Sequence, residues 1–124
     1  MFPRANILLV EPERGQDASV AACLKTLSGH PCSVARTAED DVLYLVNRYD
    51  FDCVVFGRGV DGDRAGRLSA VIKAIKPRML VVAVSESRGE PGRGPALGLD
   101  ANLAVPEQSH ILADMLRSAA RPAP

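Results

Sequence analysis

Short apolar runs alternate along the chain with segments whose apolar residues recur every three or four positions. The runs predict strands at residues 7–10, 32–35, 52–56, 79–84 and 101–104. Most of these runs lack polar alternation, which is typical of parallel strands covered by helices on both faces. The pattern therefore predicts an α/β fold, with a doubly wound, flavodoxin-like sheet of five parallel strands. In such sheets, ligands and chemistry lie beyond the carboxyl ends of the strands.

The segments between the runs predict helices. Gly29 is the expected C-cap of the first helix, and Thr37 with Asp40 resembles a capping pair for the second. Pro77 is expected to close the third helix. The expected apolar faces comprise Val20, Leu24 and Leu27; Val42, Leu45, Val46 and Tyr49; Leu68, Val71, Ile72 and Ile75; and Leu112, Met115, Leu116 and Ala119.

The fourth connection is unlike the others. "SESRGEPGRGPALG", residues 85–98, has four glycines and two prolines, which cost a helix interior about 1 and about 3 kcal/mol each relative to alanine. We therefore expect a fourth helix that is short, displaced or missing. The loop could order on a partner or an anion through Arg88 and Arg93, but a solvated connection is the preferred interpretation.

Composition narrows the function classes. The chain has 124 residues, with 15 basic and 15 acidic side chains, so no net charge attracts this domain to nucleic acid, and we expect it to bind none. No apolar run approaches the roughly 18 residues of a membrane span, and we expect a cytoplasmic protein. Residues 1–120 form one expected domain, and 121–124 a tail or the start of a linker. The three cysteines, Cys23, Cys32 and Cys53, are expected to be reduced core residues. Neither they nor the two histidines, His30 and His110, have the spacing of metal ligands.

Four segments in this order resemble the receiver domains of response regulators: "ILLVEPE", "FDCVVFG", "VVAVSES" and "GLDANLAVPE". In that family the first segment ends in an acidic pair that holds Mg²⁺, and the second in the aspartate that is phosphorylated. The third ends in a serine or threonine that contacts the phosphoryl group, and the last strand ends in Lys-Pro. The resemblance covers nearly the whole chain and implies a receiver-like fold of five strand–helix units.

Carried over by position, most of that chemistry is missing. Glu11 and Pro12 stand where the acidic pair belongs, with Glu13 one step on, and Gly57 stands at the position of the phosphorylated aspartate. Ser85 keeps the hydroxyl. Val105 replaces the lysine, although Pro106 is kept, and Asn102 stands where the family often has a switching aromatic residue.

These changes remove the groups that the reaction needs. Aspartyl phosphorylation requires a carboxylate nucleophile and a divalent ion that neutralises the phosphoryl oxygens. Glycine offers no nucleophile, valine carries no charge, and proline has no side-chain oxygen for Mg²⁺. Pro12 suits a first helical turn, and Glu11 and Glu13 suit the positive end of the following helix without any metal.

We therefore interpret the chain as a pseudo-receiver that acts in bacterial signalling through protein–protein interaction, without aspartyl phosphate, enzymatic activity or a cofactor. Its expected partner is another protein or a second copy of itself. In the receiver family such partners bind the surface formed by the fourth helix, fifth strand and fifth helix. In this chain that surface would include Arg88, Arg93, Asn102 and Arg117. Two alternatives stay open. One is a conventional receiver that is phosphorylated at Asp61 or Asp63. In this alternative Asp61 could also join Glu11 and Glu13 around a cation. The other is a small-molecule or anion binder using the glycine-rich loops.

Overall fold

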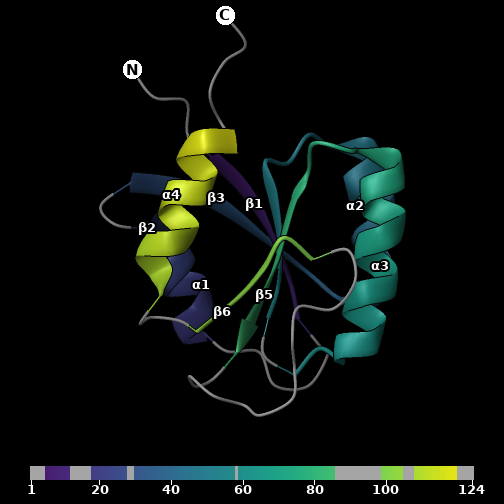
Figure 1. Ribbon diagram of the computed structural model, residues 1–124, viewed down its shortest axis with the longest axis horizontal. Coiled ribbons are helices and arrows are strands. Elements are labelled where there is room, and N and C mark those ends of the chain that lie inside the picture. Colours follow the sequence, from purple (N-terminus) through teal and green to yellow (C-terminus); the bar gives the residue numbers. More distant parts are fainter. Residues whose placement is uncertain are drawn as a thin grey trace, which may run out of the picture.

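The computed structural model describes residues 5–11, 18–27, 30–57, 59–85, 99–104 and 108–119. Strands and helices alternate along most of this part of the chain (Figure 1). The elements are β1 (Ala5–Val10), α1 (Ala18–Lys25), β2 (Thr26–Leu27), β3 (His30–Thr37), the 3-10 helix η1 (Glu39–Asp41), α2 (Val42–Arg48), β4 (Cys53–Phe56), α3 (Gly62–Ile75), β5 (Leu80–Ser85), β6 (Ala101–Ala104) and α4 (Ser109–Ala119).

The strands form one sheet in the order β2-β3-β1-β4-β5-β6. β3, β1, β4, β5 and β6 are parallel neighbours, so the predicted five-stranded parallel sheet is confirmed. β2 adds a short antiparallel strand at the edge beside β3, which the apolar pattern did not predict. Val10 pairs with both Thr37 and Phe56, so β1, β3 and β4 end at the same edge of the sheet.

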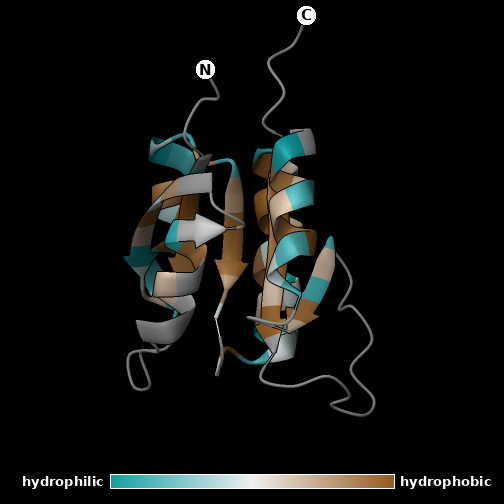
Figure 2. Ribbon diagram, turned by 90° about the vertical axis from the view of Figure 1, so that its left-hand side faces the viewer, coloured by the Kyte–Doolittle hydropathy of each residue, from teal (hydrophilic) through white to brown (hydrophobic). Residues whose placement is uncertain are grey.

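Helices cover both faces of the sheet. α1 and α4 lie on one face, and α2 and α3 on the other (Figure 1). Because successive side chains of a strand point to opposite faces, Ile7 and Leu9 pack in one core cluster and Leu8 and Val10 in the other. Figure 2 shows the central strands coloured as hydrophobic between helices that carry hydrophilic turns. The near-continuous apolar runs are thus explained by burial on both sides.

The first two helices differ from their predicted forms. α1 ends at Lys25, and Leu27 pairs with His30 in a hairpin, because strand pairing with β3 replaces the last helical turn. Thr37 ends β3 and caps no helix: its hydroxyl donates to the Ala38 carbonyl, and η1 has no side-chain cap at Ala38. Gly29 lies outside the described residues.

Where the structure describes the side chains of the expected apolar faces, Tyr49 and Val71 are exposed. Tyr49 is 52% exposed because α2 ends at Arg48 and the chain is already extended at Tyr49. Val71 is 43% exposed because the buried side of α3 runs through Ala65, Ser69 and Ile72. The third helix ends at Ile75 with Lys76 as its C-cap, directly before Pro77, as predicted.

The irregular fourth connection was expected at residues 85–98. Of these, Ser85 ends β5 and residues 86–98 lie outside the described residues, as does the expected tail, residues 121–124. Within the described part of the chain, no helix has the length and apolar character needed to cross a membrane.

Candidate functional site at the carboxyl edge of the sheet

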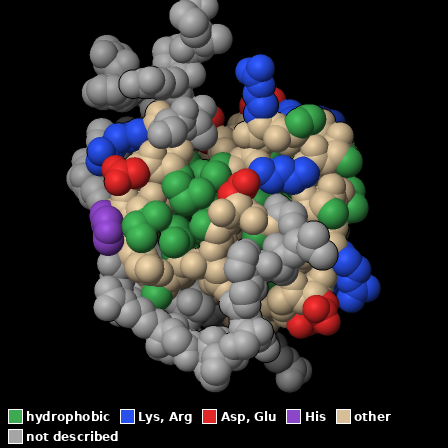
Figure 3. Space-filling model, viewed as in Figure 1, with side chains coloured by type: hydrophobic (Ala, Val, Ile, Leu, Met, Phe, Trp, Pro, Cys, Tyr) green, Lys and Arg blue, Asp and Glu red, His purple; other side chains and the backbone are tan. Residues whose placement is uncertain are grey.

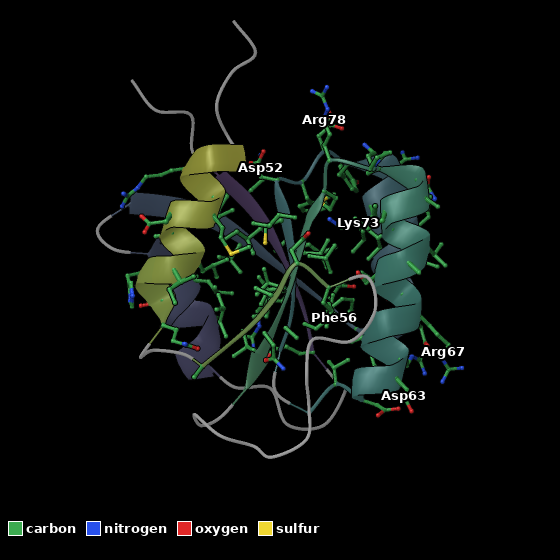
Figure 4. The ribbon with its side chains drawn as sticks, viewed as in Figure 1. Asp52, Phe56, Asp63, Arg67, Lys73 and Arg78 are labelled. Atoms are coloured by element: carbon green, nitrogen blue, oxygen red, sulfur yellow. The ribbon has the colours of Figure 1, made fainter. Side chains whose placement is uncertain are left out.

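Glu11 and Gly57 continue β1 and β4 by one residue at the carboxyl edge of the sheet. The Glu11 amide donates to the Thr37 carbonyl at 3.0 Å, and the Gly57 amide donates to the Val10 carbonyl at 2.8 Å. Figure 4 shows the direction of β4, with Asp52 before its start and Phe56 at its end. Backbone hydrogen bonds therefore hold in place the two residues that the sequence resemblance assigns to the acidic pair and to the phosphorylated aspartate.

Glu11 is a buried carboxylate bound to an arginine. Its side chain is 5% exposed, and its Oε1 accepts a hydrogen bond of 2.7 Å from Nε of Arg36, whose side chain is 37% exposed. Arg36 pairs with Leu9 across the β1–β3 ladder, one position before the end of each strand. A buried charge requires a partner of this kind, and charge-assisted hydrogen bonds are among the stronger ones in proteins.

Gly57 is buried and has little space around its α-carbon. A β-carbon at this position would lie 3.2 Å from the Val10 carbonyl oxygen and 3.3 Å from Cγ of Glu11. Both distances are shorter than ordinary contacts, so even a methyl group requires these neighbours to move. The following turn passes through Gly59 with φ of 92°, a conformation that glycine adopts without steric cost.

The other expected pocket residues are only partly described. Ser85 is the last residue of β5 and pairs with Ala104, which ends β6 at the same edge of the sheet; its side chain lies outside the description. The structure does not describe the remaining expected residues, which are Pro12, Glu13, Val105 and Pro106 of the pocket and Arg88 and Arg93 of the interaction surface.

Asp61 and Asp63 lie at the start of α3 and are exposed. The Asp61 carbonyl accepts a hydrogen bond of 2.8 Å from the Ala65 amide, while its carboxylate makes no capping hydrogen bond. Figure 4 shows Asp63 at the outer end of α3. Among the residues that the structure describes, no three histidine, cysteine, aspartate or glutamate side chains form a group able to hold a metal ion.

Sequence reasoning missed Arg36. An arginine near the end of the strand beside β1 was a usable signal, because parallel neighbours end at one edge and bring their last side chains together.

A shallow pocket of about 460 Å³ lies elsewhere, between the start of β4 and the end of α3, with the Lys76–Asp50 ion pair of 3.0 Å on its wall. This pocket is at the amino ends of the strands and is separate from Glu11 and Gly57.

The described part of the expected interaction surface comprises β6 and α4. Asn102 is exposed on β6, and Arg117 is exposed on α4, where it forms an ion pair of 3.2 Å with Asp114. Ile111 and Met115 are half-buried on the same helix. Figure 3 shows hydrophobic side chains gathered over α4 and the neighbouring strand β6.

No family model and no curated protein matches this sequence. Solved structures do. A CheY-like receiver domain from Methylobacillus flagellatus is 18% identical, with a TM-score of 0.69 over 94% of this chain and 99% of that one. A CheY-like receiver domain from Methanospirillum hungatei is 17% identical, with a TM-score of 0.66 over 94% and 93%. The fold is that of a receiver domain.

A third receiver match comes from a complex. The Saccharomyces cerevisiae co-crystal structure contains a histidine phosphotransfer signaling protein and the receiver domain of its downstream response regulator. The match is 17% identical, with a TM-score of 0.66 over 97% of this chain and 91% of that one. Together these matches establish the receiver fold, with Glu11 and Gly57 at the carboxyl edge of its sheet.

Proposed function

We propose that this protein is a phosphorylation-independent pseudo-receiver that acts in bacterial signal transduction by binding other proteins. The proposal rests above all on Gly57. The residue at the position that the resemblance assigns to the phosphorylated aspartate has no nucleophile, and Glu11 and the Val10 carbonyl crowd the space where a side chain would begin. Without a carboxylate there, no aspartyl phosphate forms at this position.

The charges around Gly57 support the same proposal. Phosphoryl transfer to a receiver uses a divalent ion to neutralise the phosphoryl oxygens. Here the Glu11 carboxylate accepts a hydrogen bond from Arg36. The alternative acceptors, Asp61 and Asp63, are exposed at the start of α3, where water and salt screen the attraction of either carboxylate for a cation.

A domain that performs no phosphoryl transfer acts through its surface. The surface formed by β6 and α4 combines exposed polar groups at Asn102 and Arg117 with half-buried apolar side chains at Ile111 and Met115. This mixture of apolar contact area and a polar border is characteristic of protein interfaces. The receiver domain in the Saccharomyces cerevisiae complex binds a protein partner, and we propose that this chain binds a partner protein or a second copy of itself.

Incubation with acetyl phosphate and Mg²⁺, followed by intact-mass spectrometry, tests the loss of phosphorylation. We expect no species heavier by one phosphoryl group, while an ordinary receiver treated in parallel gains one. A stoichiometric mass gain that disappears in Asp61→Asn or Asp63→Asn would refute the proposal and establish a conventional receiver with a displaced acceptor.

Sedimentation velocity and partner pull-down test the interaction surface. We expect the double variant Asn102→Lys/Arg117→Glu to weaken self-association or partner binding by at least tenfold. Arg67→Glu is the matched control, because Arg67 is also an exposed arginine but lies on α3, on the other face of the sheet. Equal binding by the wild type and the double variant would show that the surface is wrongly placed.

A further inference from the structure

The receiver resemblance implies Mg²⁺ beside Glu11, and the described residues do not fit that ion. Mg²⁺ requires near-octahedral coordination by oxygen atoms. Glu11 directs Oε1 to Arg36 at 2.7 Å, and Gly57 provides no side-chain oxygen. A guanidinium beside the carboxylate also repels a divalent cation that approaches it, because like charges at short range repel each other.

We propose that Arg36 is the built-in cation of this pocket and replaces the divalent ion that the family employs. The inference rests on the proposed function, since a pocket that carried out phosphoryl transfer would need a metal ion that binds and leaves. The Arg36 guanidinium neutralises Glu11 continuously. The pocket therefore does not bind Mg²⁺. The charge of the Glu11–Arg36 pair stays the same at any concentration of divalent ions around it.

The chemistry of arginine suits this role. Its guanidinium stays protonated at every physiological pH, is more weakly hydrated than an ammonium, and presents a planar set of donors to a carboxylate. β3 delivers it from the strand next to β1, with Leu9 and Arg36 in register. Glu11 is 5% exposed, so loss of the guanidinium takes a charged hydrogen-bond donor away from a buried carboxylate.

A double-mutant cycle of Arg36→Gln, Glu11→Gln and the double variant, followed by thermal unfolding, tests whether the two charges depend on each other. We expect Arg36→Gln to lower Tm by roughly 4–8 °C, because Arg36 is partly solvated and the cost is less than for a fully buried pair. In the Glu11→Gln background the same change should lower Tm by less than half as much, since no buried charge remains.

Two controls separate this pair from a general loss of charge. Arg36→Lys keeps the cation and should retain most of the wild-type Tm. Arg64→Gln removes an arginine whose partners, Glu39 and Asp40, lie near the start of α2, and its effect should be the same with Glu11 or Gln at position 11. Additive effects of the Arg36 and Glu11 substitutions would overturn the proposal.

Titration of the wild type with Mg²⁺ completes the test and does not depend on how the variants fold. We expect no change in Tm and no amide shift at Glu11 at millimolar Mg²⁺. A saturable rise in Tm with shifts at Glu11 would overturn the inference about Arg36. That result alone would leave the proposed function standing, because the proposed function fails only if a phosphodonor adds mass or the binding surface is wrong.

Discussion

Gly57 and Glu11 lie against each other where β4 and β1 end. Because little space remains beside the α-carbon of Gly57, the size of residue 57 is important for stability. The backbone around Gly57 is fixed by its hydrogen bond to Val10, so an added side chain cannot simply swing away. The glycine thus has a packing role in addition to its lack of a nucleophile.

We expect Gly57→Ala to destabilise the protein by about 1–3 kcal/mol, as overpacking in a filled core does. The new methyl group would lie 3.2 Å from the Val10 carbonyl oxygen and 3.3 Å from Cγ of Glu11. Gly66→Ala within α3 is the control and should stabilise by about 0.5–1 kcal/mol through helix propensity. Urea unfolding measures both, and a neutral or stabilising Gly57→Ala would contradict the close packing.

Cys53 provides a second prediction at this scale. Cys53 is a free, fully buried thiol, and burial, reinforced by Asp100 and Asp52, raises its pKa above the ordinary value of 9.0. The folded protein therefore holds the thiol proton more tightly than the unfolded chain does. The resulting stabilisation is complete below about pH 9 and is lost as the pH rises further, at up to about 1.4 kcal/mol per pH unit.

Urea unfolding from about pH 8 to about pH 10 measures this loss. Cys53→Ala should be less stable at neutral pH but should lose stability less steeply above pH 9. Cys32→Ala is the matched control, because it removes a half-buried cysteine and keeps Cys53, whose burial is the main cause of the raised pKa, so its slope should stay closer to that of the wild type than to that of Cys53→Ala. Equal slopes for the wild type and Cys53→Ala would refute the predicted link to this thiol.

Among the elements, β5, β6 and α3 are joined by one carboxylate. Oδ2 of Asp100 accepts hydrogen bonds from the Val81 amide at 2.8 Å and from Nζ of Lys73 at 2.6 Å. The Asp100 amide in turn donates to the Val81 carbonyl at 2.8 Å. This cluster fixes the residue that leads into the edge strand β6, and therefore the position of Asn102 on the proposed interaction surface.

We expect Asp100→Ala to cost about 1–2 kcal/mol in the free energy of unfolding, because the Val81 amide and Lys73 lose a shared acceptor. Asp114→Ala is the control. It removes the exposed partner of Arg117, and exposed pairs of this kind contribute at most about 1 kcal/mol. Urea unfolding distinguishes the two variants. If Asp100→Ala is no more destabilising than Asp114→Ala, the cluster does not hold β6 in place.

The central strands β1, β4 and β5 were predictable because each is a nearly uninterrupted apolar run, and burial on both faces leaves that signal in the sequence. β6, at Ala101–Ala104, was predicted to the residue. β2 was not predictable, since Leu27 fits the helical spacing and only pairing with His30 draws it into a strand. The predicted start of the second helix was wrong for the same reason. Thr37 resembles a helix cap in the sequence, but pairing with β1 extends β3 through it.

The candidate site was predictable in position but not in its contacts. The family resemblance placed Glu11 and Gly57 together, and the structure brings Cγ of Glu11 to 3.3 Å from the site of a β-carbon on Gly57. The Glu11–Arg36 pair joins residues 25 positions apart in the chain. It follows only from the order and register of the strands, which an apolar pattern does not specify.

At the scale of the whole molecule, the carboxyl edge of the sheet and the surface of β6 and α4 have different proposed roles. We propose that the carboxyl edge is closely packed, with the charge of Glu11 neutralised by Arg36, and that the surface of β6 and α4 binds the partner. Binding to a partner should therefore depend on Asn102 and Arg117 but be indifferent to Mg²⁺ and phosphodonors.

The most direct test of the central claim is an amide NMR titration of the protein with Mg²⁺ and then with beryllofluoride, which imitates a bound phosphoryl group. The account predicts no saturable shifts at Glu11, Gly57 or Ser85 at millimolar ligand. Saturable shifts with beryllofluoride that cluster at these three amides would contradict it, because they would establish a working phosphoryl site at the carboxyl edge of the sheet.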